Sequence, residues 1–134
     1  LLDLDAAGGG EVVAWGAGLQ APLYFFGRGK LARIGLEGIA LGLDQGPVFD
    51  RALTPKRIEL ARGQRLVLAT PGLCANLSPG GEEYGERRFE ESMVRHGPKN
   101  TTVFVDMVAG EAEDHLEREE PDEDIVLATL KRNE

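Results

Sequence analysis

The first half of the chain alternates short apolar runs with clusters of glycine and polar residues. Apolar runs of this length are typical of β-strands separated by turns. The pattern predicts strands at residues 1–5, 11–17, 22–26, 31–34, 56–60 and 65–69. Turn-forming residues 6–10 and 27–30 each separate two of these runs, so we expect two hairpins. The last run is the most continuously apolar, which favours a central position in a sheet.

The second half has the longer periodicity of helices. Residues 82–96 read as a helix that Gly97-Pro98 stops, and Asn100 or Thr101 can cap a second one. We expect one face of that second helix to carry its apolar residues, which are Val103, Phe104, Met107, Val108, Ala112 and Leu116. Residues 125–130 then predict a final strand, and the glycine-rich residues 35–47 a packed connection.

This order of elements predicts an α+β fold. We expect largely antiparallel β-sheet layers arranged as a sandwich, with two helices packed on the sheet. The 134 residues have the length of one domain. A single cysteine, Cys74, excludes an internal disulfide and favours a reducing, cytoplasmic setting. No apolar run approaches the roughly 20 residues that span a bilayer, so we expect no contact with the membrane.

The charge of the chain narrows the class of partner. The formal net charge is -8, which disfavours binding to DNA or RNA, because such binding neutralises phosphates with Lys and Arg. Nine acidic residues lie in one segment: Glu111, Glu113, Asp114, Glu117, Glu119, Glu120, Asp122, Glu123 and Asp124. We interpret this segment as a solvated helix face that runs into a loop. A partner, if there is one, is expected to be a protein.

One motif connects the chain with a known family. The stretch Gly63-Gln64-Arg65-Leu66-Val67-Leu68-Ala69-Thr70-Pro71-Gly72-Leu73 resembles the Gly-Asp-Arg-Leu-x-Leu-x-Thr-Asp-Gly-Leu motif of PPM-type metal-dependent protein phosphatases. The branch it is most similar to is the bacterial SpoIIE-like one, which acts on partner-switching regulators of sigma factors.

Four more stretches resemble motifs of that branch in the same order. They are Ala17-Gly18-Leu19-Gln20-Ala21-Pro22, Ile39-Ala40-Leu41-Gly42-Leu43, the run from Asn76 to Arg88, and Pro121-Asp122-Glu123-Asp124-Ile125-Val126. The resemblance covers nearly all of residues 1–134, but only about the C-terminal half of a complete domain. We therefore expect the chain to be the C-terminal portion of such a domain, incomplete at its N-terminus.

The resemblance implies a specific chemistry. Enzymes of this family are understood to hold two Mg²⁺ or Mn²⁺ ions that share a bridging water, and such hard cations prefer carboxylate ligands. The family's metal-binding Asp between Thr and Gly is Pro71 here, a degenerate position whose side chain offers no oxygen. The closing aspartate aligns with Glu123, so Glu123, Asp122 and Asp124 are the candidate metal ligands. The family's loop His and closing Thr are Leu19 and Val126.

The remaining reactive side chains do not form a catalytic group in the sequence. His96 and His115 lie in predicted helical segments, and Cys74 has no obvious base nearby. We expect structural or surface roles for all three, and we assign no catalytic residue.

Three hypotheses for the function follow. The first is a catalytically weakened or inactive phosphatase-like domain of bacterial signal transduction that binds a protein, such as a phosphorylated regulator. The second is an active Mn²⁺- or Mg²⁺-dependent phosphoserine and phosphothreonine phosphatase, once joined to its N-terminal half. The third is a structural domain without cofactor that forms homo-oligomers through unpaired strand edges.

Overall fold

The computed structural model describes residues 2–4, 10–18, 22–43, 46–117 and 120–133. Seven strands form two antiparallel sheets. The order of the first is β1 (Leu2–Leu4), β2 (Glu11–Ala14) and β5 (Lys56–Glu59). The order of the second is β4 (Lys30–Ile34), β3 (Leu23–Gly27), β6 (Arg65–Ala69) and β7 (Leu127–Lys131). The helices are α1 (Pro47–Ala52), α2 (Gly72–Ala75), α3 (Gly85–His96) and α4 (Thr101–Leu116).

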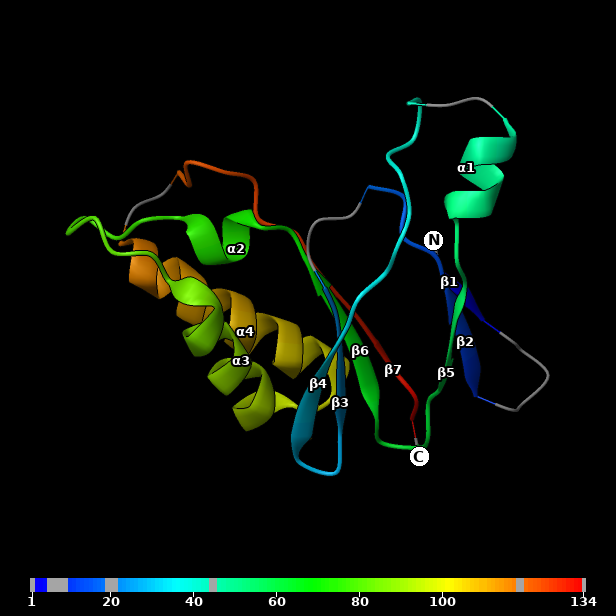
Figure 1. The fold of residues 1–134 in the computed structure, drawn as a ribbon. Coiled ribbons are helices and arrows are strands. Elements are labelled where there is room, and N and C mark those ends of the chain that lie inside the picture. Colours follow the sequence, from blue (N-terminus) through cyan, green and yellow to red (C-terminus); the bar gives the residue numbers. More distant parts are fainter. Residues whose placement is uncertain (1, 5–9, 19–21, 44–45, 118–119, 134) are drawn as a thin grey trace.

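These elements stack in three layers, with the four-stranded sheet in the middle (Figure 1). Successive side chains of a strand point to opposite faces, and the two central strands use both faces for burial. Leu23 and Leu66 join the core toward the three-stranded sheet, whereas Tyr24 and Val67 join the core beneath α3 and α4. The predicted α+β fold with antiparallel sheet layers is confirmed, and β6 is central as expected.

Helix α4 buries a narrower stripe than its sequence predicts. Phe104, Val108, Ala112 and Leu116 are buried, one per helical turn. Val103 and Met107, expected on the same face, are 36% and 43% exposed. The expectation was wrong for these two because α4 contacts the rest of the molecule along a single i, i+4 stripe. Its predicted cap is present: the Asn100 side chain accepts a hydrogen bond from the Val103 amide at 2.9 Å.

The glycine that ends α3 permits close packing of the helix on the sheet. A Cβ atom at Gly97 would collide with the ring of Phe26 on β3. The stop that the sequence predicted at Gly97-Pro98 therefore also brings this helix end onto the sheet surface.

Arg65 joins the two layers at the same place. It is fully buried on β6, and its Nε donates to the Gly97 carbonyl at 3.1 Å and its Nη2 to the Lys99 carbonyl at 2.5 Å. Its guanidinium also lies 3.9 Å from the centre of the Phe104 ring. The buried charge is thus satisfied by carbonyls of the α3–α4 connection and by an aromatic face.

Several predicted boundaries need correction. Helix α3 begins at Gly85 rather than at residue 82, because residues 77 and 83 pair in a short β-bridge. The final strand begins at Leu127 rather than 125, and β2 ends at Ala14 rather than 17. The connection at 35–47 is not packed throughout, since Leu41 and Leu43 are 75% and 77% exposed. The short helices α1 and α2 were not predicted.

The first predicted strand and the absence of a membrane-spanning helix were also expected from the sequence. The first predicted strand is present as β1, while residues 1 and 5 lie outside the described residues. Within the described residues, no helix has both the length and the apolar character that crossing a bilayer requires.

Candidate functional site

The candidate site is the corner where β6 ends and α2 begins. Strand β6 stops at Ala69, and Thr70-Pro71-Gly72 turns the chain into the short helix α2. Pro71 occupies the N-cap of α2 with φ -53° and ψ -33°, angles that its ring favours at a helix start. Its side chain is exposed but carries no oxygen, so this corner presents a hydrocarbon ring where the family motif has a carboxylate.

The acidic segment that precedes β7 lies directly against this corner. The Thr70 hydroxyl donates to the Asp124 carbonyl and accepts from the Val126 amide, both at 2.9 Å. The Thr70 amide donates to the Val126 carbonyl at the same distance. A Cβ atom at Gly72 would lie 2.5 Å from the Asp124 carbonyl oxygen, so only glycine fits there. The two stretches, some fifty residues apart in sequence, are in backbone contact.

The Asn76 side chain also connects the start of α2 with the acidic segment before β7. Its side chain is buried, and the amide group donates to the Gly72 carbonyl at 2.7 Å and to the Glu123 carbonyl at 2.9 Å. Its Oδ1 accepts from the Glu123 amide at 3.0 Å. All the hydrogen-bonding groups of a buried amide are used, except one lone pair of the oxygen. Glu123 is therefore held by its main chain, not by its carboxylate.

The described residues do not by themselves fit a divalent cation at this corner. Asp122, Glu123 and Asp124 all have exposed side chains, and Pro71 supplies no ligand. Across the parts of the chain that the structure describes, no three or more His, Cys, Asp and Glu side chains gather closely enough to hold a metal ion. The assignment of these three acids as ligands stays a prediction. Leu19, at the family's histidine position, lies outside the described residues.

A cavity of about 360 Å³ opens beside Pro71. It is formed by segments distant in sequence, and its lining residues are Pro22, Tyr24, Ala69, Thr70, Pro71, Cys74, Ala75, Glu83, Gly85, Glu86 and Phe89. Most of these side chains are apolar. Sequence reasoning did not find this cavity, because no local pattern connects strand β3 with the start of α3.

Two aromatic rings and one thiol form the inner wall of the cavity. The rings of Tyr24 and Phe89 meet edge to face, with centroids 5.4 Å apart and an interplanar angle of 86°. Burial raises the pKa of Tyr24 to about 12, and the nearby Arg33 opposes this shift. Burial also raises the pKa of the Cys74 thiol to about 11. Both groups are therefore neutral at pH 7, and Cys74 is a weak nucleophile.

The mouth of the cavity is acidic. Glu83 and Glu86 belong to its lining, and Glu90 lies one turn beyond Glu86 on α3. Arg33 of β4 pairs with two of these carboxylates, at 3.0 Å to Glu86 and 2.6 Å to Glu90. The charged residues that line the cavity are therefore both acidic, and the one guanidinium that pairs with Glu86 is shared with Glu90.

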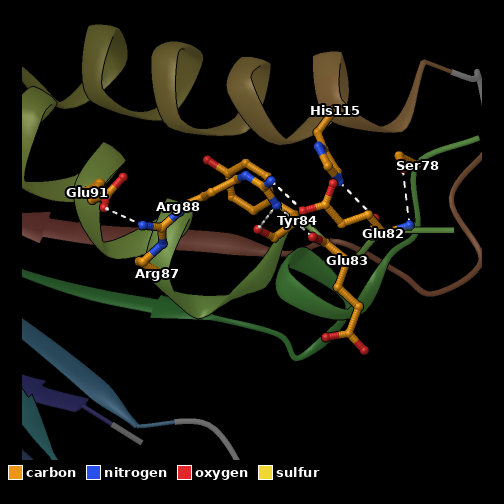
Figure 2. Close-up of polar contacts among 8 residues, drawn as sticks. All are labelled: Ser78, Glu82, Glu83, Tyr84, Arg87, Arg88, Glu91 and His115. Carbon is orange, nitrogen blue, oxygen red and sulfur yellow. Dashed lines mark hydrogen bonds and ion pairs between the residues drawn. The ribbon is translucent and has the colours of Figure 1, made fainter. Parts of the chain in front are cut away.

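The loop that carries Glu83 is braced by Arg88 and His115 (Figure 2). Arg88 donates to the Glu83 and Tyr84 carbonyls at 2.9 Å and 3.0 Å, and it pairs with the Glu82 carboxylate at 2.6 Å. His115 of α4 contacts the Glu82 carbonyl oxygen through Nε2 at 2.9 Å. Figure 2 shows Glu83 pointing away from this network while Glu82 points into it. The loop is thus fixed by main-chain contacts, and the Glu83 side chain extends outward.

The two histidines and the cysteine lie apart from one another. His96 is buried between α3 and α4, where its Nε2 lies 2.8 Å from Glu111 Oε1, and His115 braces the 82–84 loop. Neither histidine lines the cavity, whereas Cys74 does. Sequence reasoning missed Asn76, Arg88 and Tyr24. The first two stand in the stretch that resembles a family motif, which was a usable signal, but nothing local marked Tyr24.

Comparison with known proteins is consistent with this architecture. Residues 2–133 match the family described as Stage II sporulation protein E (SpoIIE). A search of curated proteins found no match. Several solved structures are similar in fold to this chain.

The SiaA-PP2C domain of Pseudomonas aeruginosa has a TM-score of 0.72 at 18% identity, over 92% of this chain and 47% of that one. A Mycobacterium tuberculosis structure of RsbU and RsbW domains has a TM-score of 0.69 at 18% identity, covering 98% and 35% of the two chains. The manganese-presoaked phosphatase domain of Bacillus subtilis SpoIIE has a TM-score of 0.65 at 10% identity, covering 99% and 55%.

At these identities the structural likeness shows the fold. The chain spans about a third to just over half of the length of these three structures. The family match covers almost every residue of the chain and agrees with the motifs found at the corner. The chain belongs to the SpoIIE family and has the architecture of its PP2C-type phosphatase domains.

Proposed function

We propose that this domain is a regulatory, protein-binding member of the SpoIIE family whose phosphatase centre is weakened or inactive. Its setting would be signal transduction of the kind that controls bacterial sigma factors. The observation that carries the proposal is Pro71, exposed at the tip of β6 where the family motif places a metal-binding aspartate.

The surroundings of Pro71 support the loss of a ligand rather than its replacement. Thr70, Gly72 and Asn76 all bind or contact the backbone of residues 123–126. These contacts fix the main chain of Glu123 but not its side chain. The position of its carboxylate therefore depends on the side-chain rotamer. Mg²⁺ tolerates displaced ligands poorly, and the Pro71 side chain offers no oxygen to complete a coordination shell.

The test is phosphate release from a phosphoserine protein substrate in the presence of Mn²⁺. We expect none above background, either from this chain or from the longest natural protein that contains it. The cavity variant Glu83→Gln should behave identically. Clear turnover that depends on Mn²⁺ would contradict the proposal.

One observation favours an active phosphatase as the alternative. The backbone of residues 123 and 124 is hydrogen-bonded to Thr70 and Asn76 at the corner, which keeps the acidic segment 122–124 beside the β6–α2 turn. Under this alternative, ligands from outside the 134 residues would complete the centre. Pro71→Asp should then raise Mn²⁺ affinity and turnover, whereas Pro71→Ala should not. Equal behaviour of the two variants would argue against a residual site.

A further inference from the structure

We propose that the cavity beside Pro71 receives a basic side chain, arginine or lysine, from the partner protein. This inference rests on the proposed protein-binding function and specifies its ligand. A phosphatase centre of this family binds an anion through its metal ions. Here the Pro71 side chain supplies no metal ligand and the charged residues that line the cavity are acidic, so a cation should be preferred to an anion.

The charge at the mouth selects for a cation. Glu83 and Glu86 line the cavity, and the guanidinium of Arg33 is shared between Glu86 and Glu90. Among the described residues Glu83 has no side-chain partner, and its carboxylate extends outward from the braced loop (Figure 2). A phosphate group entering this mouth would meet net repulsion, while a guanidinium or ammonium would meet attraction.

The interior suits the stem and head of such a side chain. Pro71, Ala75 and Phe89 provide apolar surface along which the methylene groups of arginine or lysine can pack. The cavity of about 360 Å³ has room for one such chain.

The hydroxyl of Tyr24 is the polar group that the ligand would meet inside. Tyr24 is 3% exposed and lines the cavity. As a neutral phenol it can accept a hydrogen bond from a cationic head group, and the rings of Tyr24 and Phe89 add a surface that cations favour.

The experiment uses the whole 134-residue chain and three short peptides with a central arginine, citrulline or glutamate. Citrulline is the uncharged isostere of arginine. Binding is followed by NMR shifts of the backbone amides of residues that line the cavity, with inorganic phosphate as a fourth probe. We expect saturable shifts at Ala75, Gly85 and Glu86 with the arginine peptide, and at least fivefold weaker affinity for citrulline. Glutamate and phosphate should give no shifts at these residues.

Two variants and one matched control locate the interaction. Glu83→Gln should weaken the arginine peptide about three- to fivefold, the range of an exposed ion pair. Tyr24→Phe, which keeps the ring, should weaken it about three- to tenfold, as expected for one lost hydrogen bond. The matched control is Glu91→Gln, which also removes one negative charge. Glu91 lies on α3 outside the cavity, and its ion-pair partner is Arg87 at 4.0 Å, so this variant should not change the affinity for the arginine peptide.

Equal losses in Glu83→Gln and Glu91→Gln would show attraction to the acidic protein as a whole and would overturn the inference. Tighter binding of phosphate than of the arginine peptide at these residues would overturn it too. The inference can fail separately from the proposed function. Absence of both peptide binding and phosphate release would reject only the basic ligand, whereas Mn²⁺-dependent turnover would reject the proposed function.

Discussion

At the scale of single residues, Asn76 is the group that fixes the geometry of the corner. Its three hydrogen bonds join α2 to the segment before β7 across 47 residues of sequence. A buried amide is costly to leave unpaired, and the groups that the Asn76 side chain satisfies are all backbone groups. The site therefore depends on a residue that would take no part in chemistry.

We predict that Asn76→Ala destabilises the fold by about 2–4 kcal/mol, because it removes the side-chain partner of the Glu123 amide and carbonyl and one of the two hydrogen bonds to the Gly72 carbonyl. Asn76→Asp keeps the size but loses both donors, and should cost a similar amount. Urea denaturation followed by circular dichroism measures the effect. The exposed Asn133→Ala should shift the midpoint little, and an equally small shift for Asn76→Ala would remove its assigned role.

At the scale of elements, the joint between the sheet and the helix pair depends on Arg65. It connects β6 with the α3–α4 loop through two carbonyls and stacks on Phe104 of α4. Lys131 of β7 adds a second cation, with Nζ 3.0 Å and 2.9 Å from the carbonyls of Pro98 and Lys99. The arginine of the recognised motif thus serves as a structural joint between layers.

Arg65→Met should lower the free energy of unfolding by about 2–4 kcal/mol, because it keeps the packed stem but abandons the carbonyls it satisfied. Arg65→Lys should be less damaging but still destabilising, since an ammonium lacks the planar fork. Hydrogen exchange of the Gly97, Lys99 and Asn100 amides should become faster in both. The control is Arg62→Met, at an exposed residue. Equal exchange rates of these amides in all three variants would contradict the proposed role of Arg65 in connecting the sheet with the helices.

The contact between α3 and α4 predicts a dependence on pH. Burial opposes ionisation of Glu111, but Ser92, His96 and Arg95 favour its charged form, and their combined effect puts the pKa of Glu111 below its ordinary value of 4.5. His96 Nε2 and Arg95 Nη1 lie 2.8 Å and 2.7 Å from Glu111 Oε1. A carboxyl with a depressed folded pKa stabilises the protein above its unfolded pKa.

That contribution is therefore present above about pH 4.5 and is lost as the pH falls through the folded pKa of Glu111. Urea midpoints measured between pH 3 and 7 should fall at the acidic end for the parent chain. They should fall less steeply for Glu111→Gln. The exposed neighbour Glu113→Gln should follow the parent, and identical slopes in Glu111→Gln and the parent would refute the assignment.

At the scale of the whole molecule, the four-stranded sheet belongs to both cores. Leu66 on β6 packs toward the three-stranded sheet, and its neighbour Val67 packs toward Phe89 and the helices. Both cores thus share the same strands, so neither should persist when the other is disrupted.

We predict one cooperative unfolding transition. Leu66→Ala and Phe89→Ala, one in each core, should cost about 2–5 and 3–5 kcal/mol, and each should displace the same transition. Trp15, which follows β2, reports on the sandwich side by fluorescence, and far-ultraviolet circular dichroism reports mainly on the helices. Coincident curves are expected, whereas separated curves in either variant would show two independent units.

Much of the fold could be predicted because it follows from local patterns. Alternating apolar residues marked the strands, Asn100 and Gly97 marked helix ends, and the motif around Pro71 identified the family. Errors arose where burial depends on neighbours. Val103 and Met107 are apolar but exposed, and α2 exists because Thr70-Pro71-Gly72 is pinned from outside.

The sequence alone determined that the side chain at the tip of β6 carries no metal-binding atom, because this property belongs to proline in any fold. Only the tertiary structure decided what surrounds that tip. The contact with residues 123–126, the cavity and its acidic mouth join residues more than fifty positions apart in the sequence. Such distances are set by how the layers pack, and no periodicity along the chain records them.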